Sequence, residues 1–253
     1  MPQAGDALRA VAYGRRGVPR ERADDVLAGL REVSTATLAS LLRKRGLNGL
    51  TLDGLRSTRP DARMAGYART VRYLPLREDL SVMSAGMNAQ KRAIEEIRPG
   101  EVLVIEARGD PTAGTIGDIL GLRAQVRGAA GIVTDGAIRD SAALARLEIP
   151  AYHAAVHPAV LARRHVPWES DVAVACAGVT IRPGDILVGD ADGVVVLPPA
   201  IAAEVLADAR EQERQEEFIA ARVAQGDSID GLYPLTDHTR PGYEAWLAQG
   251  DAP

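Results

Sequence analysis

The residues best suited to chemistry stand at the end of a short apolar run. Residues Ala129–Val133 predict a buried strand, Asp135-Gly136 predicts a turn that ends it, and Arg139 and Asp140 follow. In α/β proteins, small anionic ligands bind just beyond the carboxyl ends of strands. An arginine can hold a carboxylate through two parallel hydrogen bonds, and an aspartate can ligate a hard divalent cation. The pair therefore predicts a site that binds a 2-oxo acid and draws electrons from its carbonyl group.

An ordinary structural role for the same pair stays open from the sequence. Asp is a favoured N-cap residue, so Asp140 could simply begin the next helix. Arg139 and Asp140 are also adjacent and of opposite charge, as in a surface ion pair. Neither role needs a ligand.

A second candidate site is the turn Gly114-Thr115-Ile116-Gly117-Asp118, which leads into a predicted helix. The free N–H groups at a helix start attract an anion, and Gly117 would let an anion approach the backbone closely. By itself the turn is also typical of a plain helix start. Because Gly117 and Arg139 both occupy junctions of successive strand–helix units, we expect them to face one crevice with Asp140 beside it.

Two further groups of residues receive structural interpretations. His153 and His157, with His165 downstream, could be read as a zinc site, but prolines bracket the first two and the segment predicts a strand and a loop. On a strand, residues four apart share a face but lie too far apart for one zinc ion. The segment Asp190–Gly193 contains part of a calcium-loop pattern but lacks the later glutamate, so it predicts a hairpin turn.

Four glutamates lie close together near the end of the chain: Glu211, Glu213, Glu216 and Glu217. Such a run predicts the solvated face of a long helix. A carboxylate at this place could also reach the site of a neighbouring subunit, and both interpretations stay open.

Composition places the chain among ordinary globular proteins. Its 253 residues are 46% hydrophobic and 25% charged, and aromatic residues make up only 4%, so the core must be built from Val, Ile, Leu and Ala. The net charge of -4 with dispersed basic residues gives no indication of nucleic-acid binding. The single Cys176 argues for a reducing compartment. No apolar run approaches a membrane span of about 18 residues, so we expect a cytoplasmic protein without membrane or nucleic-acid partners.

Strands and helices alternate early in the chain, and hairpins dominate later, which predicts one mixed α/β domain with flanking extensions. The helix at 117–127 is expected to bury four apolar residues: Ile119, Leu120, Leu122 and Val126. The predicted helices span residues 20–33, 37–45, 84–97, 117–127, 141–147 and 200–224. The predicted strands span residues 66–73, 101–106, 129–133 and 150–156, with hairpin strands between 172 and 197.

Five segments in this order resemble the RraA-like family, which includes the regulator of ribonuclease activity A and the 4-hydroxy-4-methyl-2-oxoglutarate aldolases. The segments are Met64–Val71, Pro99–Ile105, Gly117–Leu120, Gly128–Asp140 and Pro183–Pro198. The third and fourth are the most specific. The resemblance covers roughly Val33 to Gly226.

The resemblance implies the family's fold, an α/β domain of the swivelling layered β/β/α type. The shared domain would span residues 33–226, with an N-terminal arm and helix at 1–32 and a C-terminal extension at 227–253. It also implies a homotrimer or homohexamer whose active sites lie between subunits.

The aldolase members of the family are metal-dependent class II pyruvate aldolases, and the resemblance implies roles for matching residues. Gly117, Asp118, Ile119 and Leu120 would bind the substrate's carboxylate and carbonyl through backbone amides. Arg139 would hold the substrate and stabilise the enolate, and Asp140 would ligate Mg²⁺ or Mn²⁺. Asp118 would orient a metal-bound water for proton transfer. Glu217, or Glu216 beside it, would reach in from a neighbouring subunit.

The implied activity is cleavage of a 4-hydroxy-2-oxo acid, such as 4-hydroxy-4-methyl-2-oxoglutarate, to release pyruvate. Decarboxylation of oxaloacetate passes through the same enolate, so it is expected as a side activity. No Schiff base is needed, and Lys44 and Lys91 are expected in helices away from the crevice. Two alternatives stay open: a non-catalytic inhibitor of a ribonuclease, and a lyase or hydratase for a sugar-derived 2-oxo acid.

Overall fold

The computed structural model of the chain describes residues 20–81, 86–248 and 250. The strands are β1 (Thr51–Leu52), β2 (Arg56–Ser57), β3 (Met64–Pro75), β4 (Glu101–Glu106), β5 (Gly131–Ile138), β6 (Ala151–Val156), β7 (His165–Ser170), β8 (Val174–Cys176), β9 (Val179–Ile181), β10 (Ile186–Asp190) and β11 (Gly193–Leu197). Within the described residues, one nine-stranded sheet has the order β1-β11-β10-β3-β4-β5-β6-β2, and β7 pairs with β3 beside that path. Strands β8 and β9 form a separate hairpin.

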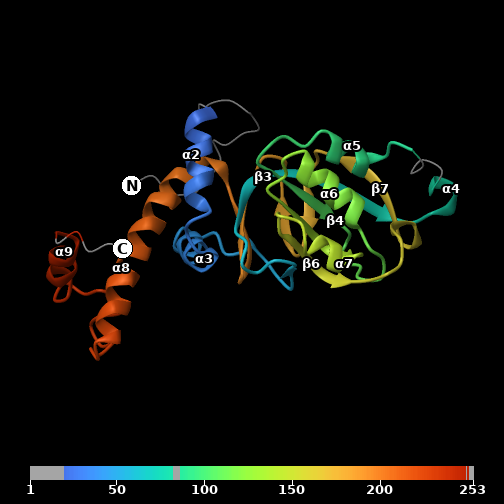
Figure 1. The fold of residues 1–253 in the computed structure, drawn as a ribbon. Coiled ribbons are helices and arrows are strands. Elements are labelled where there is room, and N and C mark those ends of the chain that lie inside the picture. The colour runs from blue at the N-terminus through green and yellow to red at the C-terminus, as the bar shows by residue number, and fades with distance from the viewer. Residues whose placement is uncertain (1–19, 82–85, 249, 251–253) are drawn as a thin grey trace.

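The helices lie in two separate groups (Figure 1). The first group consists of α4 (Glu78–Ser81), α5 (Ala89–Glu95), α6 (Asp118–Val126) and α7 (Ser141–Leu144). The second group consists of α2 (Arg20–Leu30), α3 (Thr35–Lys44), α8 (Ala202–Ala224) and α9 (Arg240–Ala248). Among the described residues, no helix is both long and apolar enough to cross a bilayer.

The part of the sheet that positions the site consists of parallel strands. Strand β4 pairs in parallel with β3 and with β5, and β5 pairs in parallel with β6. Both β4 and β5 are almost wholly buried, as is usual for parallel strands covered on both faces. Because β4 leads to α6 and β5 leads to α7, the two loops that leave these strands lie at the same edge of the sheet.

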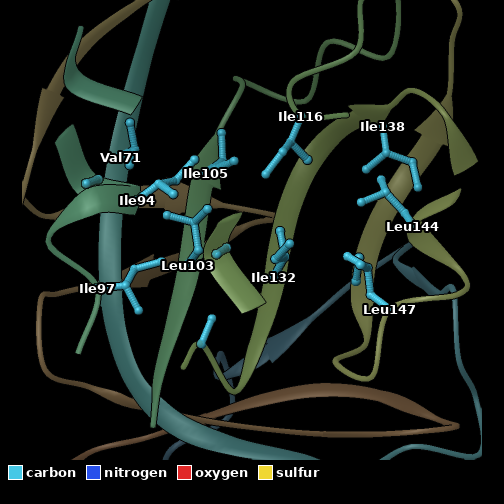
Figure 2. Close-up of a cluster of buried hydrophobic side chains, with 14 of the residues drawn as sticks. Val71, Ile94, Ile97, Leu103, Ile105, Ile116, Ile132, Ile138, Leu144 and Leu147 are labelled. Carbon is cyan, nitrogen blue, oxygen red and sulfur yellow. The ribbon is translucent and has the colours of Figure 1, made fainter. Parts of the chain in front are cut away.

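A core of aliphatic side chains fixes this edge (Figure 2). The strands contribute Leu103 of β4 and Ile132 of β5, which are both fully buried. Leu144 and Leu147 enter the same cluster from α7 and the turn after it. Ile116, in the loop before α6, is 2% exposed and packs into the cluster. The loop that precedes α6 is therefore anchored to the core by its own side chain.

The second group of helices packs on a different part of the sheet. Side chains of α2, α3 and α8 form a core with β10 and β11, in which Leu38, Val195 and Val205 are fully or almost fully buried. Helix α3 begins close to the predicted start, since Ser34 is its N-cap and accepts a hydrogen bond from the N–H of Thr37.

Helix α8 extends beyond the sheet, and α9 packs on its far end (Figure 1). We call α8 and α9 together the C-terminal arm. The contact is aromatic: the ring of Phe218 lies 5.7 Å from that of Tyr243 and 5.9 Å from that of Trp246. The sequence did not predict α9.

Most predicted elements are present, but of the four apolar residues expected to be buried on helix α6 only Leu120 packs against the core. Ile119, Leu122 and Val126 are 71%, 47% and 65% exposed, and the buried residues are Gly121 and Ala124. The reason is close packing: a Cβ at Gly121 would lie 2.4 Å from Leu144 Cδ2. The small residues thus let α6 lie directly on α7, while Ile119, Leu122 and Val126 face outward.

The predicted turn at Asp135-Gly136 is also wrong, because both residues lie inside β5 and are buried. Asp135 can be buried because its carboxylate accepts hydrogen bonds from the N–H groups of Ala107 (2.5 Å) and Gly109 (2.9 Å). Gly136 serves close packing, since a Cβ there would lie 2.7 Å from the side chain of Thr115. Strand β5 therefore runs on to Ile138 and ends directly at Arg139.

Helix α5 and strand β7 also differ from the prediction, and part of the predicted N-terminal region lies outside the described residues. The helix predicted at 84–97 is α5, which begins only at Ala89 because Asn88 caps it by accepting a hydrogen bond from the N–H of Lys91. The start of the predicted helix, at 84 and 85, lies outside the described residues, as do residues 1–19 of the expected N-terminal arm. Strand β7 was not predicted at all.

Candidate active site

The loops that leave β4 and β5 meet side by side at the sheet edge. The N–H of Thr115 donates to the carbonyl of Ala137 (2.7 Å), and the N–H of Arg139 donates to the carbonyl of Ile116 (3.0 Å). Gly114 forms an isolated parallel bridge with Ala137. These bonds extend the sheet by a few residues and bring the start of α6 against Arg139, as the sequence predicted.

Two glycines make this contact possible. A Cβ at Gly114 would lie 2.9 Å from the Cβ and Cγ of Arg139. A Cβ at Gly117 would lie 2.6 Å from Asp140 Oδ2 and 3.1 Å from Arg139 Nε. The backbone of Gly117 is extended, with φ −128° and ψ −170°, so this glycine is needed for space and not for an unusual conformation.

Asp140 has an uncommon backbone conformation. Its φ of 54° and ψ of 39° lie in the left-handed region, which is uncommon for residues other than glycine, although Asp tolerates it. Asp140 occupies the N-cap position of α7, but its side chain makes no capping hydrogen bond. The carboxylate instead turns back to Arg139, whose Nε lies 2.9 Å from Oδ2. The capping interpretation of this side chain is therefore wrong, and the ion pair is present.

The ion pair favours the ionised form of Asp140. The hydrogen bond from Arg139 holds the pKa of Asp140 below its ordinary value, and the backbone N–H of Asp118 contributes in the same direction. The two side chains are 37% and 36% exposed. Arg139 bonds only through Nε, and its terminal nitrogens have no hydrogen-bond partner among the described residues. They are free to bind a carboxylate.

Hydrogen bonds hold the loop before α6 in place beside the Arg139–Asp140 pair. The carbonyl oxygen of Thr115 accepts hydrogen bonds from Gln90 Nε2 (2.7 Å) and from the hydroxyl of Tyr73 (3.2 Å). The Thr115 hydroxyl donates to the carbonyl of Ala137 (2.9 Å). Because the N–H of Ile116 points opposite to the Thr115 carbonyl across a trans peptide, fixing that carbonyl also fixes the direction of the N–H.

The first turn of α6 offers an anion the positive end of the helix dipole. Gly117 is its N-cap and has no side chain of its own to cap the helix, although the N–H of Asp118 is directed at the Asp140 carboxylate. Asp118 Oδ1 accepts a hydrogen bond from the N–H of Ile119 (2.8 Å). Asp118 Oδ2 has no hydrogen-bond partner among the described residues, which leaves one carboxylate oxygen available for proton transfer.

A cleft of about 350 Å³ opens over this arrangement. Its lining includes every site residue that the sequence placed on the two loops: Gly117, Asp118, Ile119, Leu120, Arg139 and Asp140. Lys91 also lines the cleft, so the expectation that both lysines lie away from it is wrong for this residue. Lys91 Nζ donates one hydrogen bond to the carbonyl of Gly86 (2.8 Å).

The donor set is suited to a magnesium-type cation that the substrate helps to hold. No cluster of three or more His, Cys, Asp or Glu side chains suited to a metal occurs in the described part of the chain. Mg²⁺ is often bound by one or two carboxylates together with water and substrate oxygens. The ionised, half-exposed carboxylate of Asp140 fits that mode of binding.

The late glutamates do not line this cleft within their own chain, because α8 lies with α2 and α3, away from α6 and α7 (Figure 1). Three of them have local partners: Glu211 accepts from the hydroxyl of Tyr243 (3.0 Å), Glu213 from the N–H of Ser34 (2.6 Å) and Glu216 from Gln212 (3.0 Å). Glu217 is exposed and makes no hydrogen bond or ion pair within the described residues.

Three buried polar residues of the cleft were missed by sequence reasoning: Asn88, Gln90 and His165. Gln90, on α5, is 2% exposed, and His165, the first residue of β7, is 1% exposed. His165 was considered only as a distant zinc ligand, and Gln90 carried no motif. No local pattern marks either residue, since Gln90 precedes Lys91-Arg92 and His165 follows Arg163-Arg164.

The fold and the cleft together define a class of protein: an α/β domain whose cleft lies between a helix N-terminus and an Arg–Asp pair at the exits of two parallel strands. Comparison with known proteins identifies the family. Residues 31–196 match the RraA-like family, described as Aldolase/RraA, and the chain belongs to it.

Relatives and solved structures agree with this assignment. A Halalkalibacterium halodurans protein named "Putative 4-hydroxy-4-methyl-2-oxoglutarate aldolase" is 34% identical over 76% of this chain and 86% of its own length. A Streptomyces coelicolor structure, described as an unusual member of the RNase ES inhibitor RraA protein family, is 34% identical with a TM-score of 0.72, over 81% of this chain and 98% of its own. An uncharacterized Pseudomonas syringae protein has a TM-score of 0.77 and 27% identity, over 90% of this chain and 99% of its own. The predicted fold class is thereby confirmed.

Proposed function

We propose that this protein is a divalent-metal-dependent lyase of the class II pyruvate aldolase type. It would cleave a 4-hydroxy-2-oxo acid, such as 4-hydroxy-4-methyl-2-oxoglutarate, and release pyruvate. Decarboxylation of oxaloacetate is the expected side activity. Names of several relatives support this choice, since they are described as 4-hydroxy-4-methyl-2-oxoglutarate aldolases.

One observation carries the proposal: Gly117 brings the N-terminus of α6 against the Arg139–Asp140 pair. A Cβ at this glycine would lie 2.6 Å from Asp140 Oδ2, so any larger residue would crowd the carboxylate. A plain helix start needs no such approach. The arrangement brings hydrogen-bond donors, a guanidinium and an ionised carboxylate to one cleft of about 350 Å³, as a small 2-oxo acid requires.

In this proposal each group has a separate task. The terminal nitrogens of Arg139 and the N–H groups at the start of α6 bind the carboxylate and the carbonyl oxygen of the substrate. Asp118 accepts the proton of the C4 hydroxyl, directly or through a water that it orients. The bond between C3 and C4 then breaks, a carbonyl forms at C4, and the electron pair is left on the pyruvate enolate. Protonation at C3 gives pyruvate.

Asp140 would hold the cation, Mg²⁺ or Mn²⁺. When bound there, the cation would supply positive charge to the two oxygens of the 2-oxo acid and so stabilise the enolate. Arg139 contributes fixed charge to the same oxygens and keeps Asp140 ionised by holding its pKa low. Neither lysine is needed for covalent catalysis.

We also propose that a neighbouring subunit completes the site. Glu217 is exposed, has no partner within the described residues and stands on the C-terminal arm. Ile119, Leu122 and Val126 form an exposed apolar stripe beside the cleft, and such stripes are typical of interfaces. A homotrimer, or a hexamer formed by two trimers, would cover the stripe and bring Glu217 of one chain to the cleft of the next.

Pyruvate release tests the proposal. Purified protein would be incubated with 4-hydroxy-4-methyl-2-oxoglutarate and, separately, with oxaloacetate, each with Mg²⁺ and with EDTA. Turnover that needs the metal is the expected result. A folded oligomer that releases no pyruvate from either substrate would contradict the lyase proposal.

A second candidate function is inhibition of a ribonuclease without catalysis, because the Streptomyces coelicolor relative is described as a member of a ribonuclease-inhibitor family. The Arg139–Asp140 pair does not distinguish the two functions. Specific retention of a purified RNase E-type enzyme on the immobilised protein, together with no turnover, would favour the inhibitor. Turnover of sugar-derived 2-oxo acids in the pyruvate assay would instead favour the third possibility, a lyase or hydratase for those substrates.

A further inference from the structure

The buried end of the cleft is formed by two polar side chains, Gln90 from α5 and His165 from β7, which we call the inner wall. Both line the cleft, and they are only 2% and 1% exposed. Helix α5 packs on β7. Tyr73 connects the two residues. Its ring centroid is 5.7 Å from that of His165, and its hydroxyl donates to the Thr115 carbonyl, which also accepts from Gln90 Nε2.

His165 presents a hydrogen-bond donor that has no acceptor. Its Nδ1 lies 3.4 Å from Arg108 Nη2, and a guanidinium can only donate, so Nδ1 is the acceptor. The proton of the neutral ring is then on Nε2. That nitrogen is buried and has no hydrogen-bond partner among the described residues. Burial also lowers the pKa of His165 to about 4, so the ring is neutral near pH 7.

Gln90 presents the complementary group, an acceptor without a donor. Its Nε2 donates to the carbonyl of Thr115 (2.7 Å), which fixes the orientation of the amide. The other atom of the amide, Oε1, is not a buried unpaired atom: it is open to the cleft and has no hydrogen-bond partner in the part of the chain that the structure describes. Buried polar groups are nearly always paired, so the buried, unpaired donor of His165 next to an open acceptor at one end of the cleft indicates a ligand.

We propose that the inner wall is a subsite for a hydroxyl group on C5, in the acceptor half of the substrate and separate from the C4 hydroxyl that Asp118 serves, an inference that rests on the proposed 2-oxo acid lyase function. A hydroxyl accepts one hydrogen bond and donates another, so it satisfies His165 Nε2 and Gln90 Oε1 together. A carboxylate can only accept and would leave Gln90 Oε1 unpaired and close to a negative charge. An alkyl group would leave both atoms unpaired.

Two inert ligands that differ by one group test this subsite. In N-(2-hydroxyethyl)oxamate and N-propyloxamate, nitrogen replaces the third carbon of a 2-oxo acid, so neither can undergo retro-aldol cleavage. Their affinities would be measured by calorimetry in Mg²⁺. We expect the wild-type protein to bind the hydroxylated ligand about tenfold more tightly, which is the usual value of one or two such hydrogen bonds.

Substitutions of the inner wall should remove this preference. His165→Phe and Gln90→Leu should each bring the ratio of the two affinities close to one, while N-propyloxamate still binds. His153→Phe is the matched control, because His153 is also a buried histidine with an unpartnered nitrogen among the described residues but does not line the cleft. This control should keep the wild-type ratio. Wild-type ratios in both inner-wall variants would overturn the subsite.

A measurement on the unaltered protein gives a second test in case either variant fails to fold. In nitrogen-15 NMR spectra, the Nε2 resonance of His165 should show a protonated nitrogen and should shift on addition of the hydroxylated oxamate only. Equal shifts with both ligands would overturn the subsite. If neither oxamate binds and no pyruvate is released from any substrate, the proposed lyase function fails, and the subsite fails with it. Normal pyruvate release with no preference between the oxamates would overturn the subsite alone.

Discussion

The cleft at the exits of β4 and β5 and the C-terminal arm differ in how their charged side chains are used. In the cleft, the terminal nitrogens of Arg139 and Oδ2 of Asp118 have no protein partner among the described residues, while the backbone around them is tightly bonded. On the arm, many charged groups are occupied. Glu211, for example, accepts hydrogen bonds from Tyr243, Arg214 and Gln215.

This difference separates groups that stabilise the chain from groups that are available to a ligand. Packing and backbone hydrogen bonds hold the cleft in place without using its charges, which is how a preorganised site is built. The arm uses its charges to fix α9 on α8, through Glu211, and α8 on α3, through Glu204 and Glu213. Glu217 has no such partner among the described residues. It is therefore the glutamate to test for a contribution to the cleft of a neighbouring subunit.

The largest expected effect comes from Asp140→Asn. Asn tolerates the left-handed backbone of this position better than Ala does, so the fold should be kept while the negative charge is lost. Metal-dependent turnover should fall by about a thousandfold or more, because charge stabilisation by a metal ion contributes several kcal/mol. Kinetics in Mg²⁺ and circular dichroism measure the two properties. Wild-type turnover would show that the charge of Asp140 has only a structural role.

Gly117→Ala should lower turnover by about a hundredfold, since a displacement of about 1 Å at a catalytic group has that effect. The extended backbone of Gly117 accepts alanine, so the effect comes from the Cβ that would press on Asp140 Oδ2 at 2.6 Å. Gly49→Ala is the matched control, because a Cβ there meets nothing within 4 Å. Equal turnover in the two variants would contradict the close approach as the basis of the site.

Glu217→Gln should lower turnover roughly tenfold, the value of one hydrogen bond to a charged group. Glu204→Gln, at the other end of α8, should have no such effect. Mixed oligomers give the sharper result: chains with Asp140→Asn and chains with Glu217→Gln should regain activity when they assemble together. No recovery in confirmed mixed oligomers would mean that the arm does not serve a neighbouring cleft.

The sequence was sufficient to predict where the two strand exits meet, because glycines and apolar runs determine local structure directly. It was insufficient for the outward face of α6, since the periodicity of Ile119, Leu122 and Val126 does not show that Gly121 and Ala124 make the closer contact. Packing between elements decides that choice.

Buried polar residues were the other source of error. Asp135 looked like a turn residue because nothing in the sequence indicates that loop N–H groups would bond its carboxylate inside a strand. Gln90 and His165 became visible only when α5 and β7 were placed at one cleft. Residues brought together from distant segments carry no local pattern, so the inner wall required the structure.

The smallest effect concerns stability and pH. His165 has a pKa of about 4 in the folded protein and about 6.5 when unfolded, so the unfolded chain binds more protons between these values. The melting temperature should therefore fall as the pH is lowered from about 7 to about 5. In His165→Phe the fall should be smaller, as measured by thermal unfolding. An unchanged slope would show that the histidine is not kept neutral by its surroundings.

Calorimetric titration with pyruvate tests the central claim most directly, because it asks whether the Arg139–Asp140 pair and the start of α6 bind a 2-oxo acid together with a cation. The account predicts one pyruvate per chain in Mg²⁺, and no measurable binding in EDTA or in Asp140→Asn. Binding of pyruvate that is equally tight in EDTA and in the variant, or no binding to the wild-type protein in Mg²⁺, would contradict it.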